Sequence, residues 1–411
     1  MNTSYYTMGV DLPPPPAYEQ LVGVPVLPDA QPPAYNSDVP PAYGSGLAVK
    51  GLLQEISLQE GKPSAPQYVR QVSDEQRRQY LATLDLPPGI ANEILQSCKV
   101  FPLRIWVIDN SGSMGTSDGH KLVRGPAGNE GLQTCSRWGE LGDAILWHAT
   151  LAANLGAPTE FRLLNAPPMA AKDCLGRPRT LQHLVCGIGE PADEIAQVQE
   201  MLRTDPFGTT PLCEQLSQVV HRVKEEEARL RTQGLRALVV LASDGQATDG
   251  SISEAIHPFR DLPVCTVIRL CTDEDSVLEY WNSVDEDLEL DLDVLDDLCG
   301  EAREVAQGNP WLTYGTSLHC LREWGTGRKV LDTLDEAPLN EAQMIEMVKL
   351  IAGNDVQLPS ARDWPAFEAA IKQVNAKLGP VWDPLRSRKR PWFSVSKLKK
   401  RYSGRARCTI S

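Results

Sequence analysis

An acid and two hydroxyls follow the first long apolar run of the sequence. The run spans 103–108, and the polar side chains come next at alternate positions: Asp109, Ser111 and Ser113. A short continuous apolar run that ends in Gly and Ser is typical of a buried parallel strand. Ligands bind at the C-terminal ends of such strands in open α/β sheets. Carboxylate and hydroxyl oxygens suit Mg²⁺, which keeps several of its waters. The stretch therefore predicts part of a magnesium site.

Two later stretches supply the oxygen ligands that the first loop lacks. Thr209 and Thr210 lie in a turn just before a long helical pattern. A second apolar strand, 236–243, ends in Asp244 and Gly245. The carboxyl ends of parallel strands meet at one edge of a sheet, so this acid is expected beside the first loop. The two threonines are adjacent, which leaves the position of the hydroxyl ligand open by one residue.

In this order and spacing the chain resembles the von Willebrand factor A (vWA) domain with its metal-ion-dependent adhesion site. That family's pattern is D-x-S-x-S, then a distant Thr, then a distant Asp before Gly. The resemblance implies that Mg²⁺ (or Mn²⁺) is bound by the hydroxyls of Ser111, Ser113 and Thr210, with Thr209 as the alternative threonine. It implies that Asp109 and Asp244 act largely through coordinated waters. It also implies a protein partner that supplies an acidic residue to the cation. The alternative for D-x-S-x-S alone is an ordinary turn, because Asp and Ser often bond their own backbone.

The alternation of strands and helices predicts the fold class. We expect an α/β fold with a doubly wound, mostly parallel sheet of vWA or Rossmann-like type, flanking helical elements and disordered termini. The expected strands are 103–108, 159–165, 236–243 and 264–270, and the expected helices include 89–98, 192–203, 211–233 and 252–260. The expected domains are a disordered proline-rich tail (1–50), a helical lead-in (51–100), the vWA domain (101–309), a helical extension (310–383) and a basic tail (384–411).

Three features near or within the predicted domain have an ordinary structural interpretation. The polar insertion 115–133 is expected to be a mobile surface loop beside the site. His148 lies in a helical apolar stripe and is expected to be a core or edge histidine. The acidic stretch 273–304 keeps apolar residues at helical spacing, so we expect helices with an acidic solvated face. An EF-hand calcium loop there is disfavoured because the central glycine is missing.

The N-terminal region repeats one tetrapeptide, Pro-Pro-Ala-Tyr, three times. Each copy matches the PPxY ligand of WW domains, in which two prolines hold the polyproline II conformation and the tyrosine fills an adjacent pocket. Several such motifs on one flexible tail gain from effective concentration against a partner with several WW domains. WW domains commonly occur in HECT-type ubiquitin ligases, which are therefore possible partners. The predicted WW-binding residues are Pro15, Pro16, Tyr18, Pro32, Pro33, Tyr35, Pro40, Pro41 and Tyr43.

The last four residues, Cys408-Thr409-Ile410-Ser411, fit the C-a-a-X prenylation pattern, with serine favouring a farnesyl group. One lipid gives only marginal membrane binding, and a basic segment beside it supplies the second signal. From 386 to 411 there are ten Lys and Arg and no acid. The alternative for this run is a nuclear localisation or nucleic-acid-binding tail. The residues predicted to contact an anionic membrane are Lys397, Lys399, Lys400, Arg401, Arg405 and Arg407.

The composition of the chain and the lack of several catalytic motifs exclude a number of function classes. The formal charge of −14 makes nucleic acid an improbable partner for the bulk of the protein. The ten scattered cysteines, none in a C-x-x-C pair, suit reduced thiols, and no secretory signal or membrane span is recognised. A Walker A loop, an H-E-x-x-H zinc motif and a G-x-S-x-G nucleophile elbow are all missing. No catalytic residue is therefore predicted.

We therefore expect a binding protein and not an enzyme. The predicted protein is a cytoplasmic adaptor that is prenyl-anchored to the cytosolic face of a membrane. It would grip a partner through Mg²⁺ and recruit WW-domain proteins. The alternative is a soluble or nuclear scaffold whose basic tail binds nucleic acid or acidic proteins.

Overall fold

The computed structural model describes residues 70–124, 130–167, 181–272, 274, 277, 279–281, 284 and 292–403. The PPAY motifs, Arg405, Arg407, Cys174 and Cys408 lie outside these residues. Every cysteine that the structure describes is a free thiol. Among the described helices, none combines the length and apolar character that a bilayer crossing requires.

A six-stranded sheet forms the centre of the molecule, in the order β5-β4-β1-β6-β7-β8. All neighbouring strands pair in parallel except β5, which runs antiparallel to β4 at one edge. This is the predicted α/β fold with a mostly parallel, doubly wound sheet. The strands are β1 (Leu103–Ile108), β4 (Thr159–Leu163), β5 (His183–Cys186), β6 (Ala237–Ser243), β7 (Val264–Leu270) and β8 (Leu292–Leu295).

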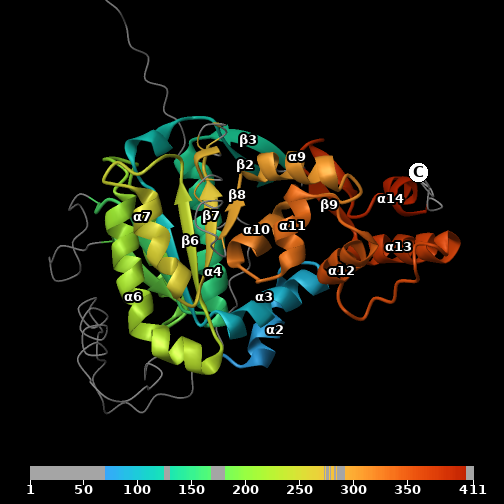
Figure 1. Cartoon of the computed structure of the whole chain (residues 1–411), viewed down its shortest axis with the longest axis horizontal. Helices are drawn as coiled ribbons and strands as arrows, with labels where there is room; N and C mark the ends of the chain where they lie inside the picture. Colours follow the sequence, from blue (N-terminus) through green and yellow to red (C-terminus); the bar gives the residue numbers. More distant parts are fainter. Residues whose placement is uncertain are drawn as a thin grey trace, which may run out of the picture.

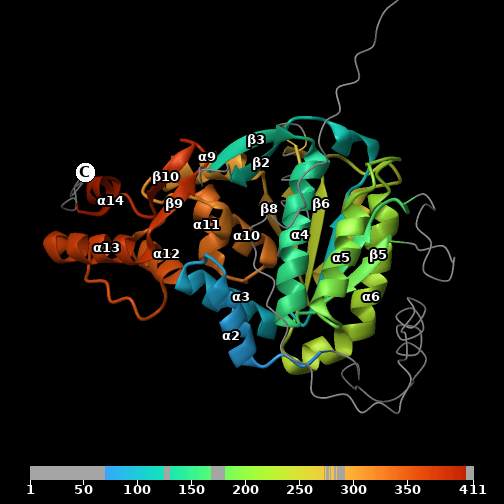
Figure 2. The ribbon, with the colours of Figure 1, turned by 180° about the vertical axis from the view of Figure 1, so that it is seen from behind.

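Side chains of β1 point alternately into two apolar layers, one on each face of the sheet. Trp106 and Ile108 join the layer that contains α4, whereas Ile105 and Val107 join the layer that contains α6. Every residue of β1, β6 and β7 is buried, as expected for strands covered on both faces. Figure 1 shows α6 and α7 on one side of the strands, and Figure 2 shows α4 and α5 from behind. The covering helices are α4 (Arg137–Leu155), α5 (Pro191–Leu202), α6 (Leu212–Gln233) and α7 (Ile252–Ile256), the last followed by the 3-10 helix η3 (His257–Asp261).

The lead-in and the C-terminal helices extend the α4 layer sideways and share its apolar core. Trp324 of α10 stacks on His148 of α4, with ring centroids 6.0 Å apart, and His148 also contacts Trp106 of β1 at 4.7 Å. His148 is fully buried, as predicted for a core histidine. The helices of this part are α2 (Asp74–Thr83), α3 (Pro88–Val100), α9 (Leu298–Gly308), α10 (Thr316–Trp324), α11 (Lys329–Glu336), α12 (Glu341–Ala352) and α13 (Trp364–Leu378).

The insertion between the loop that follows β1 and helix α4 forms a β-hairpin, where a mobile loop was expected. The 3-10 helix η2 (Gly112–Gly115) leads into antiparallel β2 (Gly119–Arg124) and β3 (Glu130–Cys135). Its strands carry few apolar side chains, so periodicity gave no strand signal there. The two strands are stabilised by pairing with each other and by contacts with α4. The His120 amide donates to Glu140 at 2.8 Å, and the Arg137 amide donates to the Thr116 carbonyl at 2.9 Å.

The acidic stretch also differs from its prediction at one end. Leu292 and Leu295 have a helical spacing, yet they lie in strand β8, which extends the sheet beside β7. Pairing with a buried strand outweighs the local pattern here.

The segment predicted as a basic tail from 384 is folded as far as Ser403. It contributes β10 (Arg388–Pro391), which pairs with β9 (Pro380–Asp383), and helix α14 (Val395–Tyr402). Trp392, Phe393 and Leu398 are buried, and Phe393 stacks on Trp311 with ring centroids 6.2 Å apart. The aromatic residues interleaved with the basic ones therefore anchor the segment to the protein.

Candidate metal centre at the sheet edge

The two predicted loops meet at the C-terminal edge of the sheet. Strands β1 and β6 pair in register, Ile108 beside Ala242, and the Asp109 amide continues the ladder by donating to the Ala242 carbonyl at 2.9 Å. The acids that follow the two strands, Asp109 and Asp244, therefore emerge side by side. Both are buried, with 0% and 4% of their surface exposed.

Hydrogen bonds connect four of the five predicted metal-site residues. The Ser113 hydroxyl donates to Asp244 Oδ1 at 2.9 Å and lies 3.0 Å from the Ser111 hydroxyl. The Ser111 amide donates to Asp109 Oδ1 at 2.8 Å, which closes the turn after β1. The turn and the metal site, which the sequence left as alternatives, are therefore compatible. The same turn brings the oxygens of both loops together.

The loop that carries Thr210 is fixed to the first loop through its backbone. The Gly112 amide donates to the Gly208 carbonyl at 3.2 Å, and the Phe207 amide donates to the Asn110 carbonyl at 2.7 Å. Gly208 has φ of +81°, and a Cβ there would lie 2.8 Å from Asn165 Oδ1, so glycine is required for the close approach. Thr210 is buried, with 7% of its surface exposed, whereas Thr209 is exposed. This favours Thr210 over Thr209 as the inward hydroxyl.

Two residues that the sequence reasoning missed hold the carboxylates. Ser243, the last residue of β6, donates its hydroxyl to Asp109 Oδ2 at 2.6 Å. Arg137, the first residue of α4, donates to Asp244 Oδ2 at 3.0 Å and also pairs with Asp118 at 2.7 Å and Glu274 at 3.2 Å. Ser243 adjoins Asp244 in the sequence and could have been suspected. Arg137 follows the hairpin, and nothing in its local sequence indicates that it reaches the site.

The charges at this edge fit a divalent cation. Burial raises the pKa of Asp109 despite hydrogen bonds from Ser243 and Ser111, and the nearby Asp244 charge raises it further. A bound cation would reverse this effect by stabilising the ionised carboxylates. The donor set consists of hydroxyl and carboxylate oxygens, which Mg²⁺ and Mn²⁺ prefer. The residues present therefore fit the metal that the sequence predicts.

Another group of carboxylates lies far along the chain, at Glu301, Glu304 and Asp335, with oxygens within 4.8 Å of one another. A buried arginine offsets part of its negative charge. Arg322 donates to Glu301 and, at 2.9 Å each, to Asp335 and Asp293. Arg322 therefore ties three of the neighbouring carboxylates into an ion-pair network, while burial raises the pKa of Glu301 and of Glu304.

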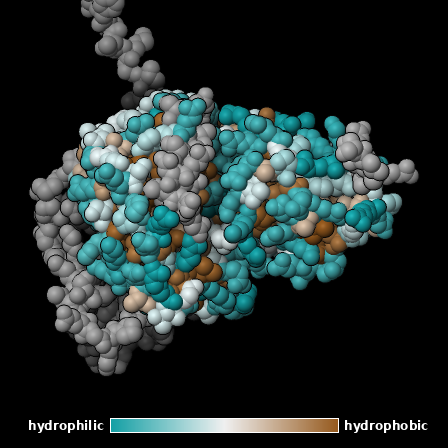
Figure 3. All heavy atoms as spheres, in the orientation of Figure 1, coloured by the Kyte–Doolittle hydropathy of each residue, from teal (hydrophilic) through white to brown (hydrophobic). Residues whose placement is uncertain are grey.

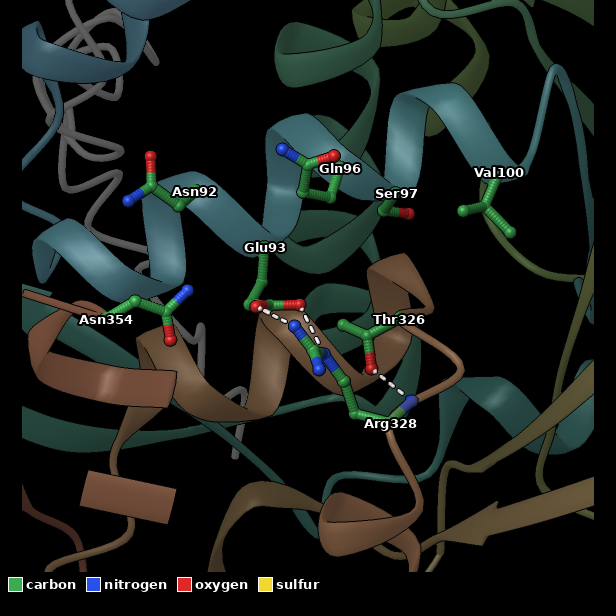
Figure 4. Close-up of a pocket in the computed structure, with 8 residues that line it drawn as sticks. All are labelled: Asn92, Glu93, Gln96, Ser97, Val100, Thr326, Arg328 and Asn354. Carbon is green, nitrogen blue, oxygen red and sulfur yellow. Dashed lines mark hydrogen bonds and ion pairs between the residues drawn. The ribbon is translucent and has the colours of Figure 1, made fainter. Parts of the chain in front are cut away.

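A hollow of about 570 Å³ lies away from the sheet edge, between α3 and the segment that follows α10. Figure 4 shows its lining. The Arg328 guanidinium donates to both oxygens of Glu93, at 2.7 and 2.9 Å, so its charged groups satisfy each other. The remaining polar lining is mostly uncharged amide, from Asn92, Gln96 and Asn354. None of the predicted site residues lies in it.

Comparisons with known proteins add little to this geometry. No family model matches the chain. No curated protein matches it either. Among solved structures it is similar to the VWA domain of SpRpn10, with 12% identity over 48% of this chain and 88% of that one, at a TM-score of 0.30. A likeness at this TM-score carries no weight for the function of the chain.

Proposed function

We propose that this protein is a metal-dependent binding protein of the vWA type that works as an adaptor, and not an enzyme. The observation that carries the proposal is the meeting of Ser111, Ser113 and Asp244 within direct hydrogen-bond distance, beside the buried Asp109. Mg²⁺ or Mn²⁺ would be held by Ser111, Ser113 and Thr210, with the two acids acting through waters. When bound, the cation supplies a strong attraction for a carboxylate.

The protein's own residues favour an external anionic ligand. Most of the direct ligands are neutral hydroxyls, so the positive charge of the cation is only partly balanced. Arg137 pairs with Asp244, and its charge is shared with Asp118 and Glu274. An acidic side chain of a partner protein would complete the balance. The Ser111 and Ser113 hydroxyls pair with each other, and Ser113 also donates to Asp244. Among the residues that the structure describes, no histidine bonds to either hydroxyl as the base of a nucleophile would.

The two ends of the sequence support the adaptor part of the proposal. Three PPAY motifs would recruit WW-domain proteins such as HECT-type ubiquitin ligases, and a prenylated Cys408 with the basic residues around α14 would hold the protein on the cytosolic face of a membrane. Partner, anchor and location are all proposals that rest on these sequence motifs.

The adaptor proposal can be tested with full-length protein from eukaryotic cells. Immobilised tandem WW domains of a HECT-type ligase should capture the wild type, and the variant with Tyr18, Tyr35 and Tyr43 all changed to Ala should be lost from the captured fraction. A control with Tyr5 and Tyr6 changed to Ala keeps the motifs intact and should bind as the wild type does. Capture of the triple variant at the same level as the wild type would contradict the proposal that the motifs recruit WW domains.

A further inference from the structure

Of the five predicted metal-site residues, all of which the structure describes, Thr210 alone has a side chain outside the hydrogen bonds that join the other four. Its place at the sheet edge therefore depends on its backbone. Thr210 is buried and lies two residues before the start of α6. Its hydroxyl can be a direct ligand only if this backbone is held firmly, because a threonine side chain is too short to correct a displaced backbone.

Thr248 holds this backbone to the loop that carries Asp244. The Thr210 amide donates to the Thr248 hydroxyl at 3.1 Å, and the Thr248 amide donates to the Thr210 carbonyl at 2.9 Å. The two threonines are therefore joined by two hydrogen bonds across 38 residues of sequence. Because Thr248 and Asp244 belong to the same loop after β6, the loop that supplies a carboxylate to the site also holds the threonine.

The next residue of this loop holds the start of α6. Pro211, at the N-cap position, makes no side-chain bond to the helix amides. Asp249 does so instead: its Oδ1 accepts from the Cys213 amide at 3.1 Å, and its Oδ2 accepts from the Glu214 amide at 2.8 Å. A carboxylate at this end binds amides that the helix leaves unpaired, and the helix dipole favours it. Thr248 and Asp249 therefore fix Thr210 together with the helix that follows it.

Asn165, which follows β4, ties the same segment to the first loop. Its side-chain amide donates to the Thr209 carbonyl at 2.7 Å. Asn165 and Asn110 also bond to each other. The Asn165 backbone amide donates to Asn110 Oδ1 at 2.8 Å, and Asn110 Nδ2 donates to the Asn165 carbonyl at 3.0 Å. Since Asn110 adjoins Asp109, the threonine segment is tied to both loops that carry the acids of the site.

A threonine held in this way favours a small cation. Mg²⁺ requires nearly ideal octahedral geometry at short distances, whereas the larger Ca²⁺ accepts more oxygens in a flexible arrangement. Selectivity between the two ions therefore depends on how rigidly the ligands are held. Among the described residues, Thr248 is the one whose side chain bonds directly to the backbone of Thr210.

We propose that Thr248 is a positioning residue of the candidate metal centre, which keeps the Thr210 hydroxyl in place and thereby favours Mg²⁺ over Ca²⁺. The inference rests on the proposed metal site and adds to it a residue that is not itself a ligand. Thr248 is exposed, so its hydroxyl can be removed without leaving a cavity in the core.

The test compares Thr248→Val with the wild type as full-length protein, because valine keeps the shape of threonine and lacks the hydroxyl. In calorimetric titrations the Mg²⁺ affinity of the variant should be about tenfold lower, as is usual when a residue that supports a metal ligand is changed. The Ca²⁺ affinity should fall by less, so the ratio of the two affinities decreases. Thr248→Ser keeps the hydroxyl and should restore both the affinity and the ratio.

Thr232→Val is the matched control. It makes the same change at an exposed threonine near the other end of α6, where the hydroxyl donates to the Ala228 carbonyl. It should bind both cations as the wild type does. Hydrogen exchange of the metal-free protein gives a second readout, because the Thr210 amide should exchange faster in Thr248→Val than in the wild type.

Failure of this inference can be told apart from failure of the proposed function. A wild type that binds no cation would overturn both. A wild type that binds Mg²⁺, with the same affinity and the same preference over Ca²⁺ in Thr248→Val, would overturn only the role of Thr248. The role is also overturned if Thr248→Ser fails to restore the affinity, or if the affinity falls without faster exchange of the Thr210 amide.

Discussion

Individual side chains at the sheet edge determine what the candidate metal centre can bind. Asp109, Ser111 and Ser113 were recognisable because their types and spacing follow a buried strand, and the structure places them with Asp244. Ser243 and Arg137 were not recognised, because their roles depend on which atoms meet across 134 and 107 residues of sequence. Sequence spacing identifies loop residues that follow a strand. It does not reveal which distant side chain supports them.

Ser243 orients Asp109, so its loss should weaken metal binding without removing a direct ligand. Ser243→Ala should lower Mg²⁺ affinity by about tenfold or more, the usual effect of removing a hydrogen bond that supports a metal-site carboxylate. Calorimetric titration of Mg²⁺ measures this. Ser73→Ala is a suitable control, because it removes the cap of α2 and leaves the Asp109 bond in place. Equal affinities for wild type and Ser243→Ala would contradict the supporting role.

Arg137 places a positive charge beside Asp244, so we expect it to weaken metal binding while strengthening attraction for an anionic ligand. Arg137→Gln should raise Mg²⁺ affinity by about tenfold, because repulsion between the two cations is removed. Arg137→Lys keeps the positive charge, so its Mg²⁺ affinity should stay below that of Arg137→Gln, although an ammonium cannot reproduce the two-point contact with Asp118. A decrease in affinity for Arg137→Gln, with an unchanged melting temperature, would show that Arg137 acts by positioning Asp244.

At the scale of secondary structure, elements with a strong apolar period were predictable, and elements defined by pairing were not. Continuous apolar runs in the sequence predict strands β1, β6 and β7, and an apolar stripe at helical spacing predicts the long helix α6. The β2–β3 hairpin and β8 do not, because polar or short strands exist only through their neighbours. No helix or strand was predicted in the basic segment after 384 for a similar reason. Its hairpin and α14 are fixed by packing against Trp311, which lies more than seventy residues earlier in the sequence.

The contact of α10 with α4 and β7 should make stability sensitive to acid. Burial lowers the pKa of His319 from 6.5 to about 4. The charged groups of this contact include Glu323 and Arg322 of α10, Arg269 of β7 and Glu140 of α4. The Tyr314 hydroxyl lies 3.2 Å from His319 Nδ1. His319 binds a proton near pH 6.5 in the unfolded chain, whereas in the folded protein it binds one only near pH 4. The contribution of His319 to the free energy of unfolding is therefore complete above pH 6.5 and is lost as the pH falls toward 4.

The size of this loss follows from the shift of the pKa, and amounts to about 3 kcal/mol of unfolding free energy between the two pH values. Chemical denaturation at a series of pH values measures it. His319→Gln should flatten the dependence in this window, whereas changing the exposed His221 to Gln should leave it as in the wild type. An unchanged slope for His319→Gln would mean that the histidine is already protonated in the folded state.

At the scale of the whole molecule, the candidate metal centre and the basic segment lie at different places on one continuous structure. Figure 3 shows one face of the molecule, which is largely hydrophilic and carries scattered hydrophobic patches. The apolar core joins the sheet to the C-terminal helices, so the two regions are presented by a single body. A protein of this form could hold a partner and contact a membrane at the same time. The motifs at the two ends of the sequence were recognisable because they are short and local, and they remain predictions.

Membrane association should depend on the exposed face of α14 as well as on Cys408. Changing Lys399, Lys400 and Arg401 together to Gln should weaken binding to anionic vesicles by about a hundredfold, at roughly 1 kcal/mol for each basic residue. Vesicle co-sedimentation at physiological salt measures this, with neutral phosphatidylcholine vesicles as the control surface. Binding that is unaffected by the triple change would place the membrane contact elsewhere.

The central claim is that the edge of the sheet near Asp109 and Asp244 binds one divalent cation. Its most direct test is calorimetric titration of Mg²⁺ into the full-length protein, beside Ser113→Ala and Asp244→Asn. We expect saturable binding of one ion by the wild type and its loss in both variants. The melting temperature of Ser113→Ala in the absence of metal should stay close to that of the wild type, whereas Asp244→Asn also removes the buried pair with Arg137 and should lower it. Wild-type protein that binds no ion, or variants that bind it as tightly as the wild type, would contradict the assignment.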